Sequence, residues 1–190
     1  MGGSSEKAPQ FCTRLSLNVI LRKMYVTQIQ AGDGMLLKKL RLPAVADTPE
    51  AFGSTLEEEQ RYSDEDWHAA AIADAEGDRS VGFLGFVGEQ ACGIAGGFLC
   101  EEVRGDAYLC AMWVDPAQRR RGLGQLLVNA VKEWALSRGA STLKLWVTDS
   151  NSAAVAFYRS LGFEPTDESK PLRSNPQLLE TLYQMSLFAA

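Results

Sequence analysis

The sequence is poor in the residues that form metal centres and disulfide frameworks. Its 190 residues include one histidine, His68, and four cysteines, none of which forms a CxxC pair. A zinc site of the usual ligand spacing is therefore not expected, and we predict that no metal is bound. Cys100 and Cys110 lie in apolar stretches. They are predicted to be buried free thiols in a reducing compartment, which indicates a cytoplasmic protein.

Long hydrophobic runs and an excess of positive charge are also missing. No run of about 18 uncharged apolar residues occurs, so no helix is expected to span a membrane. The apolar stretch 15–21 contains Ser16 and Asn18 and lacks a small-residue cleavage site, which argues against a signal peptide. The net charge of −5 argues mildly against binding to nucleic acid or to anionic membranes, and we expect neither partner.

The remaining composition is typical of one globular domain. Hydrophobic residues make up 46% of the chain and charged residues 23%, and 190 residues can enclose one sizeable core. Glycine, serine and proline punctuate residues 1–23, which we predict to be a mobile N-terminal extension. The alternation of leucine and valine over 15–21 is also compatible with an extra strand. Residues 24–190 are predicted to form the functional domain.

Hydrophobic periodicity predicts an α/β domain with a mixed sheet. We first expect a strand over 24–29, a helix from Asp33 to Val45 that Pro43 kinks or ends early, and a helix from Ser63. Further strands are expected at 81–87, 91–99, 106–114, 142–147 and 182–187, with helices at 122–139 and 152–161. The strand at 106–114 is nearly all apolar and is expected to be buried on both faces. A strand, helix and strand from 108 to 147 imply one parallel pair in an otherwise antiparallel sheet.

The turn before the long helix carries the strongest chemical signal. It reads Asp115-Pro116-Ala117-Gln118-Arg119-Arg120-Arg121-Gly122-Leu123-Gly124. The first turn of a helix has unpaired N–H groups and a partial positive charge, and the two glycines let a phosphate approach them. The segment therefore suits a diphosphate, with a solvated basic turn as the plain alternative. A dinucleotide fingerprint would need glycine at Leu127, and a P-loop would need Gly-Lys-Ser/Thr, so both fail.

This turn resembles the signature of the GCN5-related N-acetyltransferase (GNAT) superfamily, which is Gln or Arg, two residues, Gly, one residue, then Gly or Ala. Residues 119–124 fit it at every position, and 112–114 are similar to the family's preceding strand. A second family motif is matched by Asn151, Ala153-Ala154, Phe157-Tyr158 and Leu161-Gly162-Phe163. Two motifs in order, about 30 residues apart, are a specific signal. Upstream, Arg41-Leu42 and residues 49–55 are similar to bacterial members without an assigned substrate, so the resemblance covers about 24–187.

The resemblance implies a single-domain α/β GNAT fold. Its mixed, mostly antiparallel sheet would have about six to seven strands, splayed at a central parallel pair and flanked by helices. Acetyl-coenzyme A would be the acyl donor and a primary amine the acceptor, with direct transfer in a ternary complex; a homodimer is left open. The implied donor-binding residues are Met112, Trp113, Val114, Arg119, Arg120, Arg121, Gly122, Leu123, Gly124, Gln125 and Asn151.

Tyr158 is the catalytic residue that the resemblance implies. It would stand near the thioester sulfur and protonate the departing thiolate, since a phenol is neutral at pH 7 and can donate. A core tyrosine in an amphipathic helix is the alternative. The general base stays open, because some relatives carry a glutamate where this chain has Trp146. Glu57, Glu58 and Glu59 are candidates, or else form a solvated acidic helix start.

The missing acid keeps a second class of function open, a non-catalytic acyl-CoA-binding sensor or interaction module. Within the enzyme class, the modest size and single predicted domain favour a small-molecule amine over a protein N-terminus or lysine. Nucleophilic catalysis by a Cys–His pair would need His68 beside one of the cysteines. It is not expected, because the family transfers acetyl directly.

Deletion of residues 1–23 tests the predicted domain boundary. Because no motif lies there and the composition predicts mobility, the shortened chain should keep its melting temperature and its rate of acetyl transfer nearly unchanged. Thermal unfolding and a turnover assay of both chains check this. A large loss of either would mean that 15–21 is an integral strand or a contact between copies.

Overall fold

The fold is a seven-stranded sheet with helices on both faces. The computed structural model describes residues 23–188, so the predicted extension lies outside the described residues except for Lys23. The elements are β1 (Met24–Gln28), α1 (Gly34–Asp47), η1 (Pro49–Ala51), α2 (Leu56–Gln60), α3 (Asp64–Glu76), β2 (Ser80–Val87), β3 (Gln90–Leu99), β4 (Asp106–Val114), η2 (Pro116–Gln118), α4 (Leu123–Ser137), β5 (Thr142–Thr148), α5 (Ser152–Ser160), β6 (Glu164–Leu172) and β7 (Asn175–Ser186). The strand order is β1-β2-β3-β4-β5-β7-β6.

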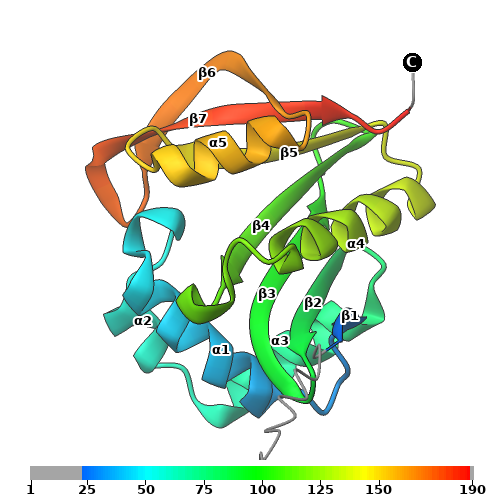
Figure 1. The fold of residues 1–190 in the computed structure, drawn as a ribbon, viewed down its shortest axis with the longest axis vertical. Helices are drawn as coiled ribbons and strands as arrows, with labels where there is room; N and C mark the ends of the chain where they lie inside the picture. The colour runs from blue at the N-terminus through cyan, green and yellow to red at the C-terminus, as the bar shows by residue number, and fades with distance from the viewer. Residues whose placement is uncertain (1–22, 189–190) are drawn as a thin grey trace, which may run out of the picture.

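Only β4 and β5 are parallel, and the other neighbouring strands are antiparallel. The predicted α/β class, with a mixed sheet and one parallel pair at its centre, is therefore confirmed. Helices α4 and α5 cover the face turned to the viewer in Figure 1, and α1 and α3 cover the opposite face of the first half of the sheet. Within residues 23–188, no helix combines the length and apolar character that crossing a membrane requires.

The two faces of the sheet carry separate hydrophobic clusters. On one face Leu127 and Val131 of α4 are fully buried against β2, β3 and β4. On the other face Leu84 and Ile94 pack with the apolar side chains of α1 and α3. Because β2 and β3 have buried residues on both faces, their sequences are nearly all apolar and show little alternation of polar and apolar residues.

Glycines in β2 and β3 let α4 lie close to the sheet. A Cβ atom on Gly97 would lie 2.9 Å from Cγ1 of Val131, and one on Gly93 would lie 3.0 Å from Cδ1 of Leu127. The glycine punctuation of these strands thus has a packing role, because any side chain there would push the helix away.

Several local expectations need correction. Helix α1 does not end early at Pro43 but continues to Asp47, because Ala44 and Val45 are fully buried and anchor its last turn. Asp33 precedes the helix without capping it, since its carboxylate accepts the N–H of Gln30 at 2.8 Å. Ser63 begins α3 as expected, with a complete capping box.

Strand β4 and its cysteine also differ from expectation. Its middle is not buried on both faces, because Cys110 is exposed and its neighbours Ala111 and Met112 are only partly buried. Cys100 is partly buried, whereas Cys92 is the fully buried thiol. The physical reason is that the centre of β4 borders a cleft instead of packed side chains.

Strand β6 had no sequence signal. It reads Glu-Pro-Thr-Asp-Glu-Ser-Lys-Pro-Leu, which resembles a loop, but it pairs with β7 along one edge of the sheet. Prolines and charged side chains are typical of an edge strand, because its outer N–H groups need no partner. Strand β7 is correspondingly longer than the predicted 182–187.

Substitution of Gly97 by alanine should destabilise the fold. The new methyl group would meet Val131 and Trp134 at 2.9 and 3.1 Å, so we expect the free energy of unfolding to fall by about 1–3 kcal/mol, as for an overpacked core. The control is Gly32→Ala, where a Cβ has nothing within 4 Å. Urea unfolding of both variants decides: equal midpoints would contradict close packing of α4.

Candidate functional site

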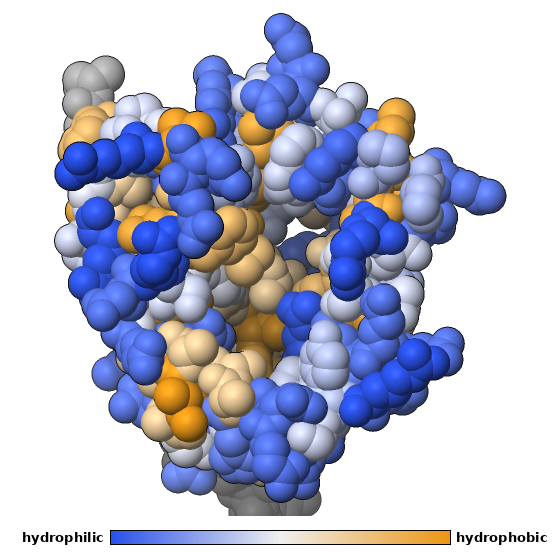
Figure 2. Space-filling view, turned by 180° about the vertical axis from the view of Figure 1, so that it is seen from behind, coloured by the Kyte–Doolittle hydropathy of each residue, from blue (hydrophilic) through white to orange (hydrophobic). Residues whose placement is uncertain are grey.

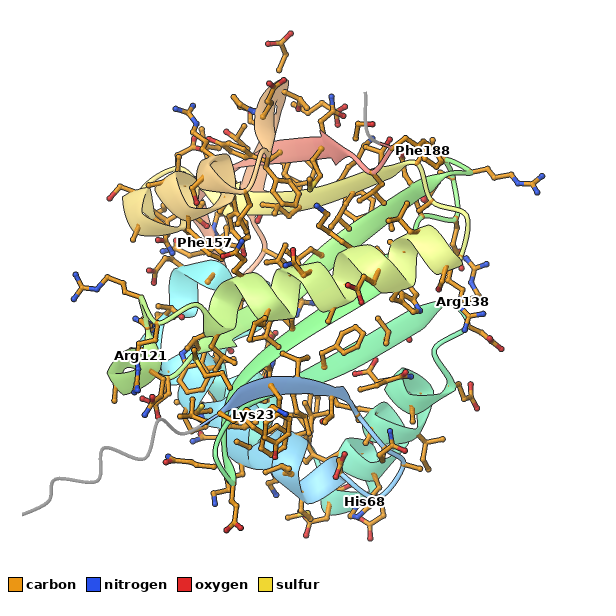
Figure 3. All side chains as sticks on the ribbon, turned by 45° about the vertical axis from the view of Figure 1, so that its right-hand side comes forward. Lys23, His68, Arg121, Arg138, Phe157 and Phe188 are labelled. Carbon is orange, nitrogen blue, oxygen red and sulfur yellow. The ribbon has the colours of Figure 1, made fainter. Side chains whose placement is uncertain are left out.

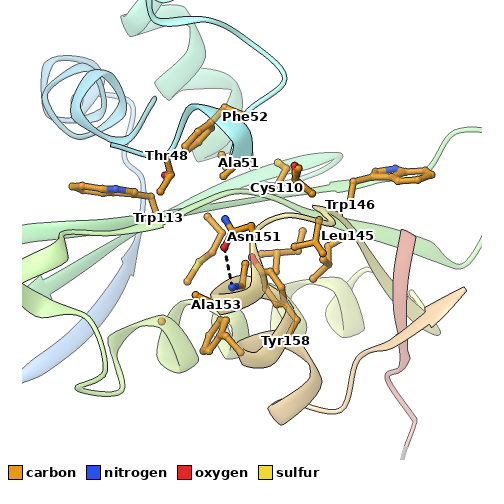
Figure 4. A pocket seen from close by; sticks show the side chains of 18 of the residues that line it. Thr48, Ala51, Phe52, Cys110, Trp113, Leu145, Trp146, Asn151, Ala153 and Tyr158 are labelled. Atoms are coloured by element: carbon orange, nitrogen blue, oxygen red, sulfur yellow. Dashed lines mark hydrogen bonds between the residues drawn. The ribbon is translucent and has the colours of Figure 1, made fainter. Parts of the chain in front are cut away.

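A cleft opens where the two parallel strands part. Strands β4 and β5 pair only through Asp106–Tyr108 and Thr142–Lys144, and they diverge beyond these three residue pairs. The space between them is part of a cleft of about 890 Å³. Figure 2 shows its hollow from the side of α1–α3, with an apolar floor inside a polar rim. In Figure 4, Asn151 and Tyr158 lie on one side of it and Thr48, Ala51 and Phe52 on the other.

A bulge shapes the free edge of β4. The register with β3 shifts between Ile94 and Gly96, and opposite this shift Ala111 has a φ of 52°. Positive φ is rare for alanine and marks a backbone distorted locally by the bulge. Past Tyr108 the edge of Met112–Val114 that faces β5 has no strand partner. Its backbone groups are therefore free on the side of the cleft, where an extended ligand could pair with them.

The N-terminus of α4 lies at one end of the cleft. Arg120 and Gly122 have positive φ values of 59° and 97°, which turn the chain sharply into the helix. No side chain caps the helix, and the first intrahelical bond joins the N–H of Leu126 to the carbonyl of Gly122. The N–H groups of residues 123–125 therefore have no partner within the helix and could bind an anion.

Gly124 keeps this site accessible. A Cβ at this position would lie 3.2 Å from Cζ of Phe157 and 3.3 Å from Cε of Met112. Figure 3 shows Phe157 of α5 beside the start of α4, and Arg121 on the turn before the helix. A larger side chain would fill the narrow space between the two helices.

Three predicted donor residues have side chains that are already engaged. The guanidinium of Arg119 forms an ion pair with Asp47 and donates to the carbonyl of Val114 at 2.8 Å. The indole of Trp113 donates to the same Asp47 carboxylate at 2.9 Å. Arg121 donates to Gln118 at 2.6 Å. These side chains hold the turn in place. Among the described arginines that line the cleft, Arg120 is the one whose guanidinium has no hydrogen bond or ion pair with another residue.

Asn151 and Tyr158 face the cleft from α5. The Oδ1 atom of Asn151 caps the helix by accepting the N–H of Ala154 at 3.0 Å, the dashed line in Figure 4, and its NH₂ group stays available as a donor. Tyr158 is 8% exposed and packs edge-on against Phe163. Burial raises the pKa of Tyr158, and the Cys110 thiol adds to this shift, so the phenol stays protonated. It is thus both a core residue and a hydroxyl donor on the cleft wall.

The three glutamates considered as bases do not line the cleft. Glu59 is 2% exposed and pairs with Arg41 at 2.7 Å. Glu58 completes the capping box of α2, and Glu57 pairs with Arg61 on the surface. The interpretation as an acidic helix start therefore fits Glu57 and Glu58, while Glu59 has a structural role that its sequence context did not reveal.

The geometry of the described residues does not support nucleophilic catalysis by a cysteine. His68 is exposed on α3 and lies outside the cleft that Cys110 lines. Cys110 is accessible from the cleft, but the surrounding walls remove its sulfur from bulk water and raise its pKa to about 11. A thiol of this pKa is a poor nucleophile at neutral pH. Within residues 23–188, no three histidine, cysteine or acidic side chains group into a metal site.

The hairpin of β6 and β7 supplies site residues that sequence reasoning missed. Lys170 and Glu180 line the cleft, and the Lys170 ammonium lies 4.0 Å from the ring centre of Trp146. The turn of the hairpin closes the end of the cleft next to η1, because Arg173 and Ser174 donate to the carbonyls of Gly53 and Phe52, both at 2.6 Å. No local pattern marks these residues, since they reach the cleft only through strand pairing.

Comparison with known proteins agrees with the fold and the motifs. The family model of the Acetyltransferase (GNAT) family matches residues 44–163. An N-acetyltransferase of Methanocaldococcus jannaschii is 41% identical over 69 residues, 36% of this chain and 30% of that protein. The ribosomal protein bS18-alanine N-acetyltransferase of Escherichia coli is 36% identical over 105 residues, 55% of this chain and 69% of that protein.

A solved structure shows the same fold. This is yncA, an acetyltransferase from Salmonella typhimurium with its cofactor acetyl-CoA, which has a TM-score of 0.72 at 18% identity. The alignment covers 88% of this chain and 96% of that chain. The match to the family model spans more than half of the 190 residues. The fold and the enzyme class that the two motifs predicted, an N-acetyltransferase, are confirmed at the level of the family: this chain belongs to the GNAT acetyltransferases.

Proposed function

We propose that the protein transfers an acetyl group from acetyl-CoA to a primary amine by direct attack within a ternary complex. The observation that carries this proposal is a single cleft that joins two different walls. The open N-terminus of α4 and the free edge of β4 form one wall, the donor wall. Residues of α1, η1 and β7 form the other, the acceptor wall. Two substrates can therefore meet at the gap between β4 and β5.

The donor wall fits an extended ligand that ends in a diphosphate. The N–H groups at the start of α4 would bind the diphosphate, with added charge from Arg120. The backbone of Met112–Val114 and the amide of Asn151 would bind the pantetheine arm. Acetyl-CoA, when bound, supplies the acetyl thioester. The engaged side chains of Arg119 and Trp113 would act as supports of this wall and not as contacts.

Tyr158 is proposed as the general acid. Its hydroxyl lines the cleft near Cys110, at the level where β4 and β5 have parted. A phenol held neutral by burial can donate a proton to a departing thiolate without first carrying a charge.

The acceptor is proposed to be a small-molecule amine, with a protein N-terminus or lysine as the alternative. The closed end of the cleft, where the β6–β7 turn is bonded to the backbone of Phe52 and Gly53, favours a compact acceptor. The E. coli relative, whose name gives a ribosomal protein alanine as its acceptor, supports the alternative. A cytoplasmic location and a homodimer stay predictions of the same proposal.

A thiol-release screen tests the proposed function. The protein is incubated with acetyl-CoA and polyamines, amino acids, aminoglycosides or peptides, and free CoA thiol is followed with time. Steady release with at least one amine is expected. Binding of acetyl-CoA without release by any amine would favour the second candidate, a non-catalytic acyl-CoA-binding module.

Gly124→Glu should abolish acetyl-CoA binding while the protein stays folded. The new carboxylate would occupy the position of the phosphate and repel it. The fold should survive, because the atoms nearest to the new Cβ, at 3.2 and 3.3 Å, are the movable ends of the Phe157 and Met112 side chains. Calorimetric titration measures the affinity, and Gly32→Glu provides the same charge at an exposed glycine. Unchanged affinity in folded Gly124→Glu protein would refute the assignment of the anion site.

Tyr158→Phe should lower kcat about 10²-fold with little change in acetyl-CoA affinity, because it removes a proton donor and preserves the packed ring. Turnover at saturating acetyl-CoA is measured beside a direct binding constant, with Tyr25→Phe on the exposed edge strand as the control. If the residue only packs, both values stay within a few-fold of the parent. If it anchors the donor, affinity falls together with rate.

A further inference from the structure

An amine acceptor needs a proton acceptor in the cleft. A primary amine is mostly protonated at neutral pH, and only its neutral form can attack a thioester. Of the described acidic residues, two line the cleft, Glu50 of η1 and Glu180 of β7. The three glutamates of α2 that the sequence offered as bases, Glu57–Glu59, do not line it.

Strand register places Glu180 at the open end of β5. It lies opposite Thr148 of β5 and opposite Lys170 of β6, so all three share one face of the sheet. The hydroxyl of Thr148 donates to the backbone carbonyl of Glu50 at 2.5 Å, which identifies this as the face that carries η1. Glu180 therefore lies on the acceptor wall, across the sheet from α5.

The surroundings of Glu180 suit proton transfer. Its side chain is 13% exposed and lies 3.4 Å from the Lys170 ammonium, which also contacts the ring of Trp146. Desolvation raises the pKa of Glu180, although Lys170 partly opposes this effect. A carboxylate of raised pKa accepts a proton more readily than a solvated one. Glu59, in contrast, accepts three hydrogen bonds from the Arg41 guanidinium and is not free to accept a proton.

We propose that Glu180 is the proton acceptor for the amine and contacts its nitrogen directly or through one water molecule. The inference rests on the proposed acetyl transfer and adds the missing base to it. One ammonium proton passes to the Glu180 carboxylate and from there to solvent. The neutral nitrogen then bonds to the carbonyl carbon as the C–S bond breaks. Tyr158 protonates the sulfur, and the second proton lost by the nitrogen restores the phenol.

The test is Glu180→Gln, which keeps the size of the side chain but removes its basicity. With the most active amine from the screen, we expect kcat/KM for that amine to fall about 10²-fold, while calorimetric affinity for acetyl-CoA stays unchanged. The matched control is Glu164→Gln, an exposed glutamate of the same hairpin that lies outside the cleft. It should retain parental rates.

A pH profile separates a base from a structural residue. In the parent, kcat/KM should fall on the acid side as Glu180 becomes protonated, and this dependence should vanish in Glu180→Gln, leaving only the ionisation of the amine. Lys170 of β6 is the charged group in contact with Glu180, and Glu50, Arg41 and Arg173 also line the cleft. Because Arg41 and Arg173 are bonded to Glu59 and to the Gly53 carbonyl, Lys170→Met and Glu50→Gln are the variants measured alongside.

Each outcome is decisive. If Lys170→Met reproduces the loss and Glu180→Gln keeps the parental pH profile, Glu180 only orders Lys170 and the proposal fails. If Glu50→Gln alone loses activity, Glu50 is the base. Parental turnover by Glu180→Gln refutes this inference but leaves acetyl transfer intact, whereas absence of turnover in the parent with every amine refutes both.

Discussion

Strands β4 and β5 stop pairing after three residue pairs, and the whole site depends on this separation. When neighbouring strands part, both rows of backbone N–H and C=O groups lose their partners, which is costly unless other groups satisfy them. On β4 the Val114 carbonyl is satisfied by Arg119, and the bulge takes Ala111 and Met112 out of the regular pairing with β3. The remaining free edge faces a cleft, where an extended ligand that carries amides can complete the hydrogen bonding.

A single carboxylate holds the separated edge in place. Asp47, the last residue of α1, binds the indole of Trp113 on β4 and the guanidinium of Arg119 on the turn that follows. Helix α1 contributes to the proposed acceptor wall, whereas that turn leads into α4 of the proposed donor wall. Asp47 thus connects the two walls, so a ligand that displaced α1 would also disturb the start of α4. Nothing in its local sequence distinguishes this aspartate, because its partners lie 66 and 72 residues away.

The backbone geometry of the proposed donor wall could be predicted from the sequence, whereas that of the proposed acceptor wall could not. Residues 112–125 are contiguous, and the features that matter belong to the backbone: an apolar strand, glycines that allow a sharp turn, and an uncapped helix start. Such features are local, so spacing alone reveals them. Glu180 and Lys170 reach the cleft through the pairing of β5, β7 and β6, and the segment around Lys170 even reads as a loop. Tyr158 lies between these cases: the sequence offered a cleft residue or a core residue, and the structure combines the two, since Tyr158 lines the cleft and packs against Phe163.

The difference between the two walls also limits what relatives reveal about the second substrate. The proposed acceptor wall combines α1, the segment around Phe52, and the β6–β7 hairpin, which are distant in sequence and held together by a few bonds such as that from Ser174 to the Phe52 carbonyl. A change of one residue in any of these segments can alter the wall while the donor turn keeps its geometry. The family match at 44–163 ends before β6 begins. The hairpin that carries Glu180 therefore lies outside the part of the chain that defines the family, and its own contacts must identify the acceptor.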